Sequence, residues 1–264
     1  MSGGYARLLA LLREMGSVAV AFSGGVDSTL LLRAAKDALG DRVAAVTVRS
    51  CFVPARELRA AEDYCASAGA RLILLDADTL AIPGVADNPP ERCYLCKRAI
   101  FTRITETARE LGLSWVAEGS NQDDLGDYRP GMRAIRELGV RSPLLEAGLT
   151  KAEIRAISKE LGLPTWDKPA MACLATRVET GQRLEPETLS RVERAEEWLA
   201  EQGFRQLRVR VHGDLARLEL DPEGLARLRD PAAVRAVHSA LHGFGFRWVT
   251  VDLGGYRMGS MNAL

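Results

Sequence analysis

Apolar segments alternate with amphipathic segments through the first 165 residues. An amphipathic helix is expected over Tyr5–Met15, and helix-period segments separate the apolar runs that follow it. Buried strands alternating with helices of about 10–15 residues are typical of βαβ units around a parallel sheet. Residues 1–165 are therefore expected to form an α/β domain with a parallel sheet, whose strands we place at Val18–Phe22, Val43–Val48, Leu72–Leu75, Trp115–Ala117 and Val140–Leu144.

The last helix of this domain is expected over Thr150–Leu161. It begins with a capping box, Thr150 to Glu153, and ends at Gly162 and Pro164. The periodicity is then lost, so residues 166–185 are predicted to be a linker. Residues 186–264 are expected to form a smaller α/β domain, with helices at 186–202, 222–229 and 231–242 and strands at 206–211, 215–220 and 247–253.

Composition and charge narrow the class of protein. Hydrophobic residues make up 47% of the 264 residues, and no apolar run reaches the roughly 20 residues of a membrane span. Because no signal-peptide pattern is visible and five cysteines do not make a disulfide framework, a soluble protein of the cytoplasm is expected. Basic and acidic residues are equal at 35 each, so nucleic acid is not expected as a partner. A membrane is not expected as a partner either, because the sequence shows no apolar span. We expect a small-molecule substrate and a homo-oligomer.

The string SGGVDS joins the first predicted strand to the next helix. Gly24 and Gly25 let backbone N–H groups approach an anion, Ser23 and Ser28 add hydroxyl donors, and the helix dipole favours negative charge there. No Gly-Lys-Ser/Thr follows, so this is not a Walker A loop. The string therefore predicts a phosphate site made by Ser23, Gly24, Gly25, Val26, Asp27 and Ser28.

This string resembles the loop of the ATP pyrophosphatases, the PP-loop enzymes. The resemblance implies that ATP is split between its α- and β-phosphates and that Asp27 helps to hold Mg²⁺. It also implies that a second loop, residues 118–131, faces the first across the nucleotide, with Gly119 and Asn121 at ATP, Asp124 near the metal and Arg129 near a substrate anion. On its own, this second loop would be an ordinary turn between a strand and a helix.

Three cysteines stand in noteworthy surroundings. Cys93 and Cys96 form a Cys-x-x-Cys pair, which could be a redox pair, half a metal site or two helix cysteines. Lys97, beside the pair, is a candidate for holding phosphate or carboxylate. Cys173 lies in the predicted linker, four residues before Arg177, and a loop cysteine near cations favours a reactive thiolate. The remaining two, Cys51 and Cys65, are expected to be buried small hydrophobes.

Five ordered motifs together resemble the LarE family of ATP-dependent sacrificial sulfur insertases. They are SGGVDS, ERCYLCK, the EGSNQDD…RPG loop, ACLATR and RVRVHGD, and the resemblance extends from about Val18 to the end of the chain. It implies an AMP-forming sulfurtransferase that uses ATP and Mg²⁺ in the synthesis of the nickel-pincer nucleotide cofactor. The substrate would be pyridinium-3,5-biscarboxylic acid mononucleotide, adenylated on a carboxylate. The thiolate of Cys173 would then displace AMP, and cleavage of its Cβ–S bond would leave dehydroalanine.

The resemblance also assigns roles to further residues. Cys173, Asp27, Lys97 and Arg177 would be catalytic; Arg208 and Arg210 would bind the substrate phosphate; Glu196 and Glu219 would be polar or metal-binding groups. Arg208 and Arg210 alternate with two valines, so without the resemblance they are interpreted as the solvent face of a strand.

Other functions stay open at this level. Some members of the family carry three cysteines around the linker and hold an iron–sulfur cluster, whereas this chain has only Cys173 there. The sacrificial version therefore fits better, although Cys93, Cys96 and Cys173 leave a three-thiolate cluster formally open. A tRNA-thiolating enzyme would use the same adenylation, an amide-forming enzyme such as NAD synthetase would share the loop, and a regulatory module would bind the nucleotide without turnover. The balanced charge argues against the first, and the second has no need of Cys173.

Overall fold

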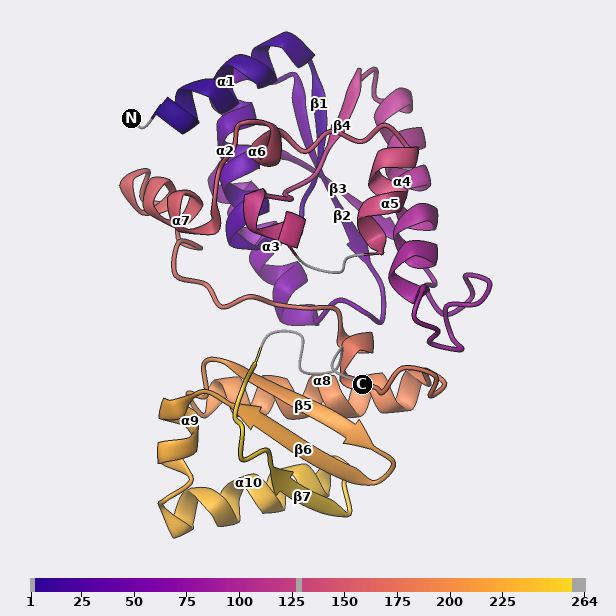
Figure 1. Ribbon diagram of the computed structural model, residues 1–264, viewed down its shortest axis with the longest axis vertical. Helices are drawn as coiled ribbons and strands as arrows, with labels where there is room; N and C mark the ends of the chain where they lie inside the picture. The colour runs from indigo at the N-terminus through magenta and orange to yellow at the C-terminus, as the bar shows by residue number, and fades with distance from the viewer. Residues whose placement is uncertain (1–2, 127–129, 258–264) are drawn as a thin grey trace. The chain divides into compact units, whose positions relative to one another are not determined.

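The computed structural model describes residues 3–126 and 130–257. These residues form two compact units (Figure 1). The first unit contains the described residues up to Asp78 together with Glu91–Lys168. The second contains Thr79–Pro90 and the described residues from Pro169 onward, so a short segment between two elements of the first unit belongs to the second.

The first unit is built on a four-stranded, fully parallel sheet. Its strands are β1 (Val18–Ala21), β2 (Val43–Arg49), β3 (Arg71–Asp76) and β4 (Trp115–Ala117), in the spatial order β3-β2-β1-β4. All four were expected from their apolar runs. The α/β class with a parallel sheet is thus confirmed.

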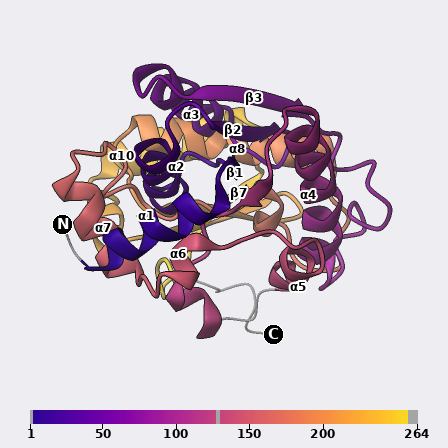
Figure 2. The same cartoon turned by 90° about the horizontal axis from the view of Figure 1, so that it is seen from above.

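Helices cover both faces of this sheet, as Figures 1 and 2 show. Side chains of α1 (Gly3–Met15), α2 (Val26–Leu39), α3 (Ala55–Ser67) and α7 (Lys151–Glu160) share one hydrophobic core. Those of α4 (Arg92–Glu110) and α5 (Gly131–Glu137) share another. Successive β1 residues point to these opposite cores, Val18 and Val20 to the first and Ala19 to the second, which explains why the strands lack polar alternation.

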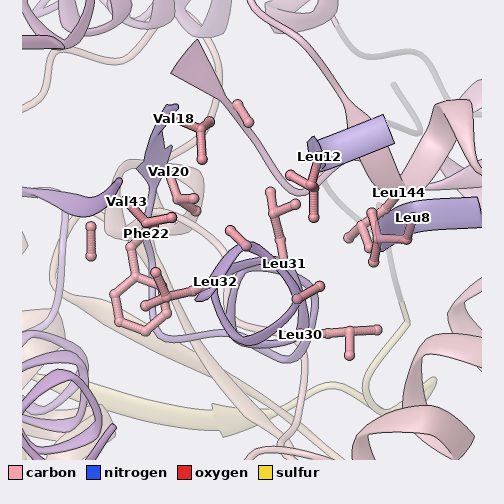
Figure 3. Packing of buried hydrophobic residues seen from close by; sticks show 14 of the residues in the cluster. Leu8, Leu12, Val18, Val20, Phe22, Leu30, Leu31, Leu32, Val43 and Leu144 are labelled. Atoms are coloured by element: carbon pink, nitrogen blue, oxygen red, sulfur yellow. The ribbon is translucent and has the colours of Figure 1, made fainter. Parts of the chain in front are cut away.

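The helix α2 is the centre of the larger core. Three consecutive leucines, Leu30, Leu31 and Leu32, are fully buried there (Figure 3). They lie among side chains of β1, β2, α1 and the short helix α6 (Pro143–Glu146), such as Val20, Leu12 and Leu144. The helix that begins at the SGGVDS string is therefore held firmly at the centre of the unit.

Near the end of the first unit, the predicted capping box is present but the predicted fifth strand is not. The capping box of α7 is present, with the Thr150 side chain accepting from the backbone of Glu153 and the Glu153 carboxylate accepting from the backbone of Thr150. The strand expected at Val140–Leu144 is wrong. Only Arg141 forms a parallel bridge, to Ala117, and Pro143 then begins α6 because its fixed φ suits the first turn of a helix.

The second unit contains a three-stranded sheet. Its strands β5 (Leu207–His212), β6 (Leu215–Leu220) and β7 (Trp248–Val251) lie in that order, β6 antiparallel to β5 and parallel to β7. Its helices are α8 (Pro186–Glu201), α9 (Pro222–Arg227) and α10 (Pro231–Gly243). The short helical turns are η1 (Gln122–Gly126) in the first unit and η2 (Leu174–Arg177) in the second. No helix within the described ranges has the length and apolar character needed to cross a membrane.

The buried leucines of α2 make a stability prediction. Replacing Leu31 by Ala should lower the free energy of unfolding by about 2–5 kcal/mol, because a fully buried side chain is removed and leaves a cavity. Leu125→Ala is the matched control, since Leu125 is 63% exposed and the same change should cost little. Urea unfolding followed by circular dichroism measures both, and equal effects would contradict the central position of α2.

Candidate functional site

The order of the parallel strands marks one point of the first unit as a candidate binding site. From β1 the chain crosses to β2 on one side, and β4 lies on the other side of β1. Open parallel sheets bind ligands outside the carboxyl ends of the strands where the strand order reverses. Here that point lies between β1 and β4, and the two loops that sequence analysis selected follow these two strands.

The loop after β1 is shaped by its glycines and serines. Gly24 has a φ of +67°, which a residue with a side chain rarely adopts, and Gly25 caps α2 without a side-chain hydrogen bond. The Ser28 hydroxyl lies 3.1 Å from the Ser23 hydroxyl and donates to the Gly25 carbonyl at 3.2 Å. The first backbone N–H groups of α2 thus have no side-chain cap from Gly25, as an anion site at a helix start requires.

Asp27 connects the two loops. The side-chain amide of Asn121 donates to the Asp27 carboxylate at 3.2 Å, and the ammonium of Lys151 pairs with the other carboxylate oxygen. The backbone N–H of Asn121 in turn donates to the Asp124 carboxylate at 2.9 Å. The backbone N–H of Lys151 donates to the Asp123 carboxylate at 2.8 Å. A single asparagine therefore places Asp27 and Asp124 on the same side of the sheet edge.

Gly119 allows the second loop to approach the first. A Cβ atom at this position would lie 3.2 Å from the Cβ of Asp27 and 3.2 Å from the backbone nitrogen of Ser28. Such contacts are tighter than most Cβ atoms make, so any larger residue would push the loops apart. Gly119 is therefore needed for close packing beside residues 23–28, the predicted phosphate loop.

Glu118 fixes the start of the second loop from inside. Its buried carboxylate accepts from the hydroxyls of Ser120 and Ser142, at 2.9 and 2.5 Å, and from the backbone N–H of Ser120 at 3.1 Å. These three donors satisfy a buried acidic group. Glu118 therefore orients the loop.

Asp27 and Asp124 fit a magnesium site in their chemistry. Mg²⁺ is usually bound by one or two carboxylates together with substrate phosphates and water, which is what these two residues beside a phosphate loop provide. The part of the chain that the structure describes contains no group of three or more His, Cys, Asp or Glu side chains that could hold a metal by themselves.

Lys168 adds a second cation to the phosphate loop. Its ammonium donates to the Gly24 carbonyl at 2.9 Å and pairs with the carboxylate of Glu57, 8% exposed, at 2.7 Å. The contact holds the loop backbone in place through its carbonyl.

The region of the Cys-x-x-Cys pair lies at the start of α4. Cys93 and Cys96 are partly exposed in the first turns of this helix, and the Arg92 guanidinium donates to the Cys93 sulfur at 3.6 Å. The aliphatic part of Lys97 lies against Gly131, the first residue of α5. Of the interpretations weighed for the pair, the one that needs only two helix cysteines agrees with this placement.

Arg129, Cys65 and Cys51 had predictions of their own. Arg129 lies outside the described residues. Cys65 is buried on α3 as expected, and burial raises the pKa of its thiol to about 11. The expectation that Cys51 is buried is wrong: it lies just beyond the end of β2 and is exposed, because the strand has ended and the chain turns outward there.

Cys173 lies in the second unit on a segment held by Arg177. One nitrogen of the Arg177 guanidinium donates to the carbonyls of Ala172 and Cys173, at 2.7 and 3.0 Å. The other two nitrogens donate to the Glu196 carboxylate at 2.9 and 2.8 Å. The thiol-bearing residue itself is exposed, while both members of this ion pair are buried.

The ion pair governs the ionisation of both partners. Burial by itself raises the pKa of Glu196, but the Arg177 charge and hydrogen bonds outweigh it, so the pKa is lowered. Burial likewise lowers the pKa of Arg177, but the charge and hydrogen bonds of Glu196 outweigh it and the pKa is raised. The pair is therefore fully charged near neutral pH.

Arg208 and Arg210 do not form a solvent face. They are 3% and 5% exposed, so that alternative is wrong, because β5 is covered on both of its faces. Arg208 donates to the carbonyls of Leu207 and Ala170, each at 2.6 Å, and forms no ion pair within the described ranges. Burial, and then the neighbouring charge of Arg177, lowers the pKa of Arg208 to about 10.

Arg210 shares its donors between a carboxylate and the cysteine segment. It donates to the Glu219 carboxylate at 2.9 Å and to the Thr176 carbonyl at 2.7 Å. Glu219 is fully buried and also pairs with Arg217 at 3.4 Å. Glu196 and Glu219 thus serve here as partners of arginines, and a metal at either carboxylate stays a prediction.

Several residues of this arrangement were missed by sequence reasoning. Lys151, Lys168 and Glu57 reach the phosphate loop or Asp27 from distant positions, and Glu118 was seen only as part of a motif. Lysine and glutamate are common on helices and loops, so no sequence pattern distinguishes these three residues from ordinary surface residues. Only Lys151 could have been noticed, because it follows the N-cap residue of a predicted helix, and its backbone N–H there donates to Asp123.

The chain is similar to other proteins over nearly its whole length. The chain is 41% identical over 249 residues to an uncharacterized protein of Synechocystis, which covers 94% of this chain and 93% of the relative. It is 39% identical over 259 residues to the pyridinium-3,5-bisthiocarboxylic acid mononucleotide synthase of Lactiplantibacillus plantarum, a LarE protein, covering 97% and 93%. A search of family models finds no match.

A more distant likeness is confined to part of the chain. The glutamine-hydrolysing GMP synthase of Phaeosphaeria nodorum is 27% identical over 196 residues, which cover 62% of this chain and 36% of that enzyme. This likeness points to a shared PP-loop domain. With the nearly full-length identity to the synthase, it shows that the chain belongs to the LarE family of PP-loop ATP pyrophosphatases.

Proposed function

We propose that this protein transfers the sulfur of Cys173 to pyridinium-3,5-biscarboxylic acid mononucleotide, after activating a carboxylate of that substrate with ATP. The observation that carries the proposal is the nearly full-length identity to a synthase named for the corresponding bisthiocarboxylic acid mononucleotide. The exposed cysteine on a segment fixed by buried arginines supports it.

The first step is adenylation of the substrate carboxylate. A carboxylate oxygen attacks the α-phosphorus of ATP, the bond to the β-phosphate oxygen breaks, and pyrophosphate leaves. The backbone N–H groups at the start of α2, with Ser23 and Ser28, would bind the pyrophosphate portion. Asp27 and Asp124 would hold Mg²⁺, which when bound offsets the charge that develops on the leaving pyrophosphate.

Cations of the first unit would support the same step. Lys151 already pairs with Asp27, and its ammonium can turn from that carboxylate to a phosphate oxygen. Lys97, beside Gly131, is the candidate for holding the substrate or its phosphate. Asn121 would keep Asp27 and Asp124 oriented through its two donors.

The second step transfers sulfur from the chain itself. The Cys173 thiolate attacks the activated carbonyl carbon, AMP leaves, and a thioester to the protein forms. A base then removes the Cα proton, the Cα–Cβ double bond forms, and the Cβ–S electron pair leaves with the sulfur. The products are a thiocarboxylate on the substrate and dehydroalanine at position 173, so one chain donates one sulfur atom.

Arg208 and Arg210 would bind the phosphate of the substrate. A buried guanidinium without an ion pair, as Arg208 is within the described ranges, favours an anionic ligand because its charge is compensated only in part, by two carbonyls and the ring of Tyr256. Arg210 lies two residues away on the same face of β5, so both can contact one phosphate.

Asp27→Ala should lower pyrophosphate release by about 100-fold or more, because the metal on the leaving group loses a ligand. The loops lose the contacts of Asp27 with Asn121 and Lys151, but the fold should be retained because the buried leucines of α2 hold this unit together, which circular dichroism checks. Asp41→Ala is the matched control, because Asp41 is fully exposed and pairs with Lys36, away from both loops. Pyrophosphate release measured with ATP, Mg²⁺ and the biscarboxylate nucleotide compares the two; normal release by Asp27→Ala would exclude a catalytic role for Asp27.

Cys173→Ala should still form the acyl adenylate but transfer no sulfur, since the nucleotide loops are unchanged. Cys93→Ala and Cys96→Ala should still transfer sulfur. In the unaltered protein, peptide mass mapping after reaction should find dehydroalanine at position 173 and at no other cysteine. Sulfur transfer by the Cys173 variant, or its loss in the Cys93 and Cys96 variants, would favour a cluster-based mechanism instead.

Arg208→Ala should weaken substrate binding about tenfold or more and leave ATP affinity nearly unchanged, because it removes charge-assisted hydrogen bonds to the phosphate. Arg194→Ala is the matched control, since Arg194 is an exposed arginine of α8 in the same unit. Isothermal titration calorimetry with each ligand gives both affinities, and undiminished substrate affinity in Arg208→Ala would refute the phosphate role.

A further inference from the structure

We infer that Arg208 and Arg210 also tether the segment that carries Cys173, and that an anion which binds these two arginines loosens this segment. The inference rests on the proposed function, which gives the two arginines to the phosphate of the substrate. It adds a coupling between filling of the phosphate site and the freedom of the nucleophile.

The two arginines hold the segment on both sides of Cys173. Arg208 donates to the Ala170 carbonyl at 2.6 Å, three residues before the cysteine. Arg210 donates to the Thr176 carbonyl at 2.7 Å, three residues after it. The two groups assigned to the phosphate are therefore also the two that fix the ends of this segment.

Arg177 holds the middle of the segment in a different way. Its contacts to the Ala172 and Cys173 carbonyls come from a guanidinium whose charge is matched by Glu196. The Thr176 hydroxyl donates to the Cys173 carbonyl as well, at 2.7 Å. Arg177 gives two nitrogens to Glu196 in a forked pair, whereas Arg210 donates to Glu219 at 2.9 Å and shares that carboxylate with Arg217. An incoming anion therefore has less to gain at Arg177 than at Arg208 or Arg210, and the centre of the segment stays anchored.

The contacts of Arg208 with Ala170 and of Arg210 with Thr176 can be replaced by contacts with a phosphate. The carbonyls of Ala170 and Thr176 are neutral acceptors, whereas a phosphate offers several oxygens with a full negative charge. Arg208 is buried and has no ion pair in the described part of the chain, and the lowered pKa of this group agrees with a charge that is compensated only in part. A phosphate that reaches these guanidinium groups should therefore replace the carbonyls.

In the reaction, binding of the substrate phosphate would therefore come before the movement of the Cys173 thiol. With a phosphate on Arg208 and Arg210, the backbone carbonyls of Ala170 and Thr176 lose their contacts with these two arginines, while the Cys173 carbonyl and the Thr176 hydroxyl keep their contacts with Arg177. The thiol can then swing about a fixed backbone point. The arginines act as positioning residues for Cys173 in addition to binding the substrate.

Hydrogen–deuterium exchange of the full chain tests this coupling with inorganic phosphate as the probe. The Thr176 N–H donates to the Cys173 carbonyl at 3.0 Å and reports on the segment. Saturating phosphate, compared with chloride at equal ionic strength, should speed exchange in peptides that span 170–177 by about twofold or more. A bound anion ordinarily slows exchange at its site. Faster exchange on adding phosphate would therefore indicate the proposed loosening of the segment, whereas slower exchange would indicate that phosphate only orders it.

Variants make the test specific. Arg208→Ala should show fast exchange over 170–177 in chloride and no further response to phosphate, and Arg194→Ala should respond as the unaltered chain does. Arg208→Lys, which keeps the charge and loses the forked donors, should respond less, and it serves if Arg208→Ala does not fold.

Two results would overturn the inference in distinguishable ways. If calorimetry shows that phosphate binds and exchange over 170–177 is unchanged or slower, the coupling is wrong while the phosphate role survives. If phosphate does not bind the unaltered chain, the phosphate role in the proposed function fails and the coupling fails with it. Faster exchange in the unaltered chain that is lost in the Arg208 variants supports both.

Discussion

The buried ion pair between Arg177 and Glu196 is the constraint on which the cysteine segment depends. Both side chains are almost fully buried, and removing one partner of such a pair typically costs about 3–5 kcal/mol because the other charge is left uncompensated. Glu196 also accepts from the backbone N–H of Val209 at 2.9 Å, so α8, β5 and η2 meet at this one carboxylate. The ion pair therefore also fixes the backbone position of Cys173, because the Cys173 carbonyl accepts from the Arg177 guanidinium.

In the first unit, an uncharged residue, Asn121, holds two candidate site residues in place. Asn121 donates to Asp27 with its side chain and to Asp124 with its backbone, which keeps two acidic residues together beside a phosphate loop. Lys151 compensates part of their charge. The loops proposed to bind the nucleotide thus belong to one unit and Cys173 to the other, so the two proposed half-reactions depend on separate sets of residues.

Sequence patterns predicted most of the fold, because strands and helices leave periodic signals. The exception at Val140–Leu144 arose where Pro143 begins a helix after a single bridge. Patterns also could not show that Thr79–Pro90 belongs to the second unit. Asn88 explains the grouping: its side chain donates to the Glu179 carbonyl at 2.8 Å, a contact across 91 positions that leaves no trace in local sequence.

For the candidate site, the sequence predicted the local backbone but not the side-chain contacts. The glycine turn between β1 and α2 and the position of Cys173 outside a regular helix or strand were both expected from composition, and the phosphate role of that turn stays a prediction. The partner of Asp27, Lys151, stands 124 positions away, and the burial of Arg208 depends on what covers β5. Because Arg208 alternates with valine, the sequence suggested that its side chain faces solvent. Local sequence cannot distinguish an exposed arginine from a buried one on such a strand, since burial depends on which elements pack against it.

The central claim, that the chain gives up its own sulfur, is tested most directly by isotope transfer. Protein whose cysteines carry a heavy sulfur isotope would be incubated with ATP, Mg²⁺ and the unlabelled biscarboxylate nucleotide, with unlabelled sulfide present. Sulfur donation by Cys173 predicts thiocarboxylate that carries the heavy isotope, formed up to one sulfur per chain. Product that contains unlabelled sulfur and exceeds one sulfur per chain would contradict it.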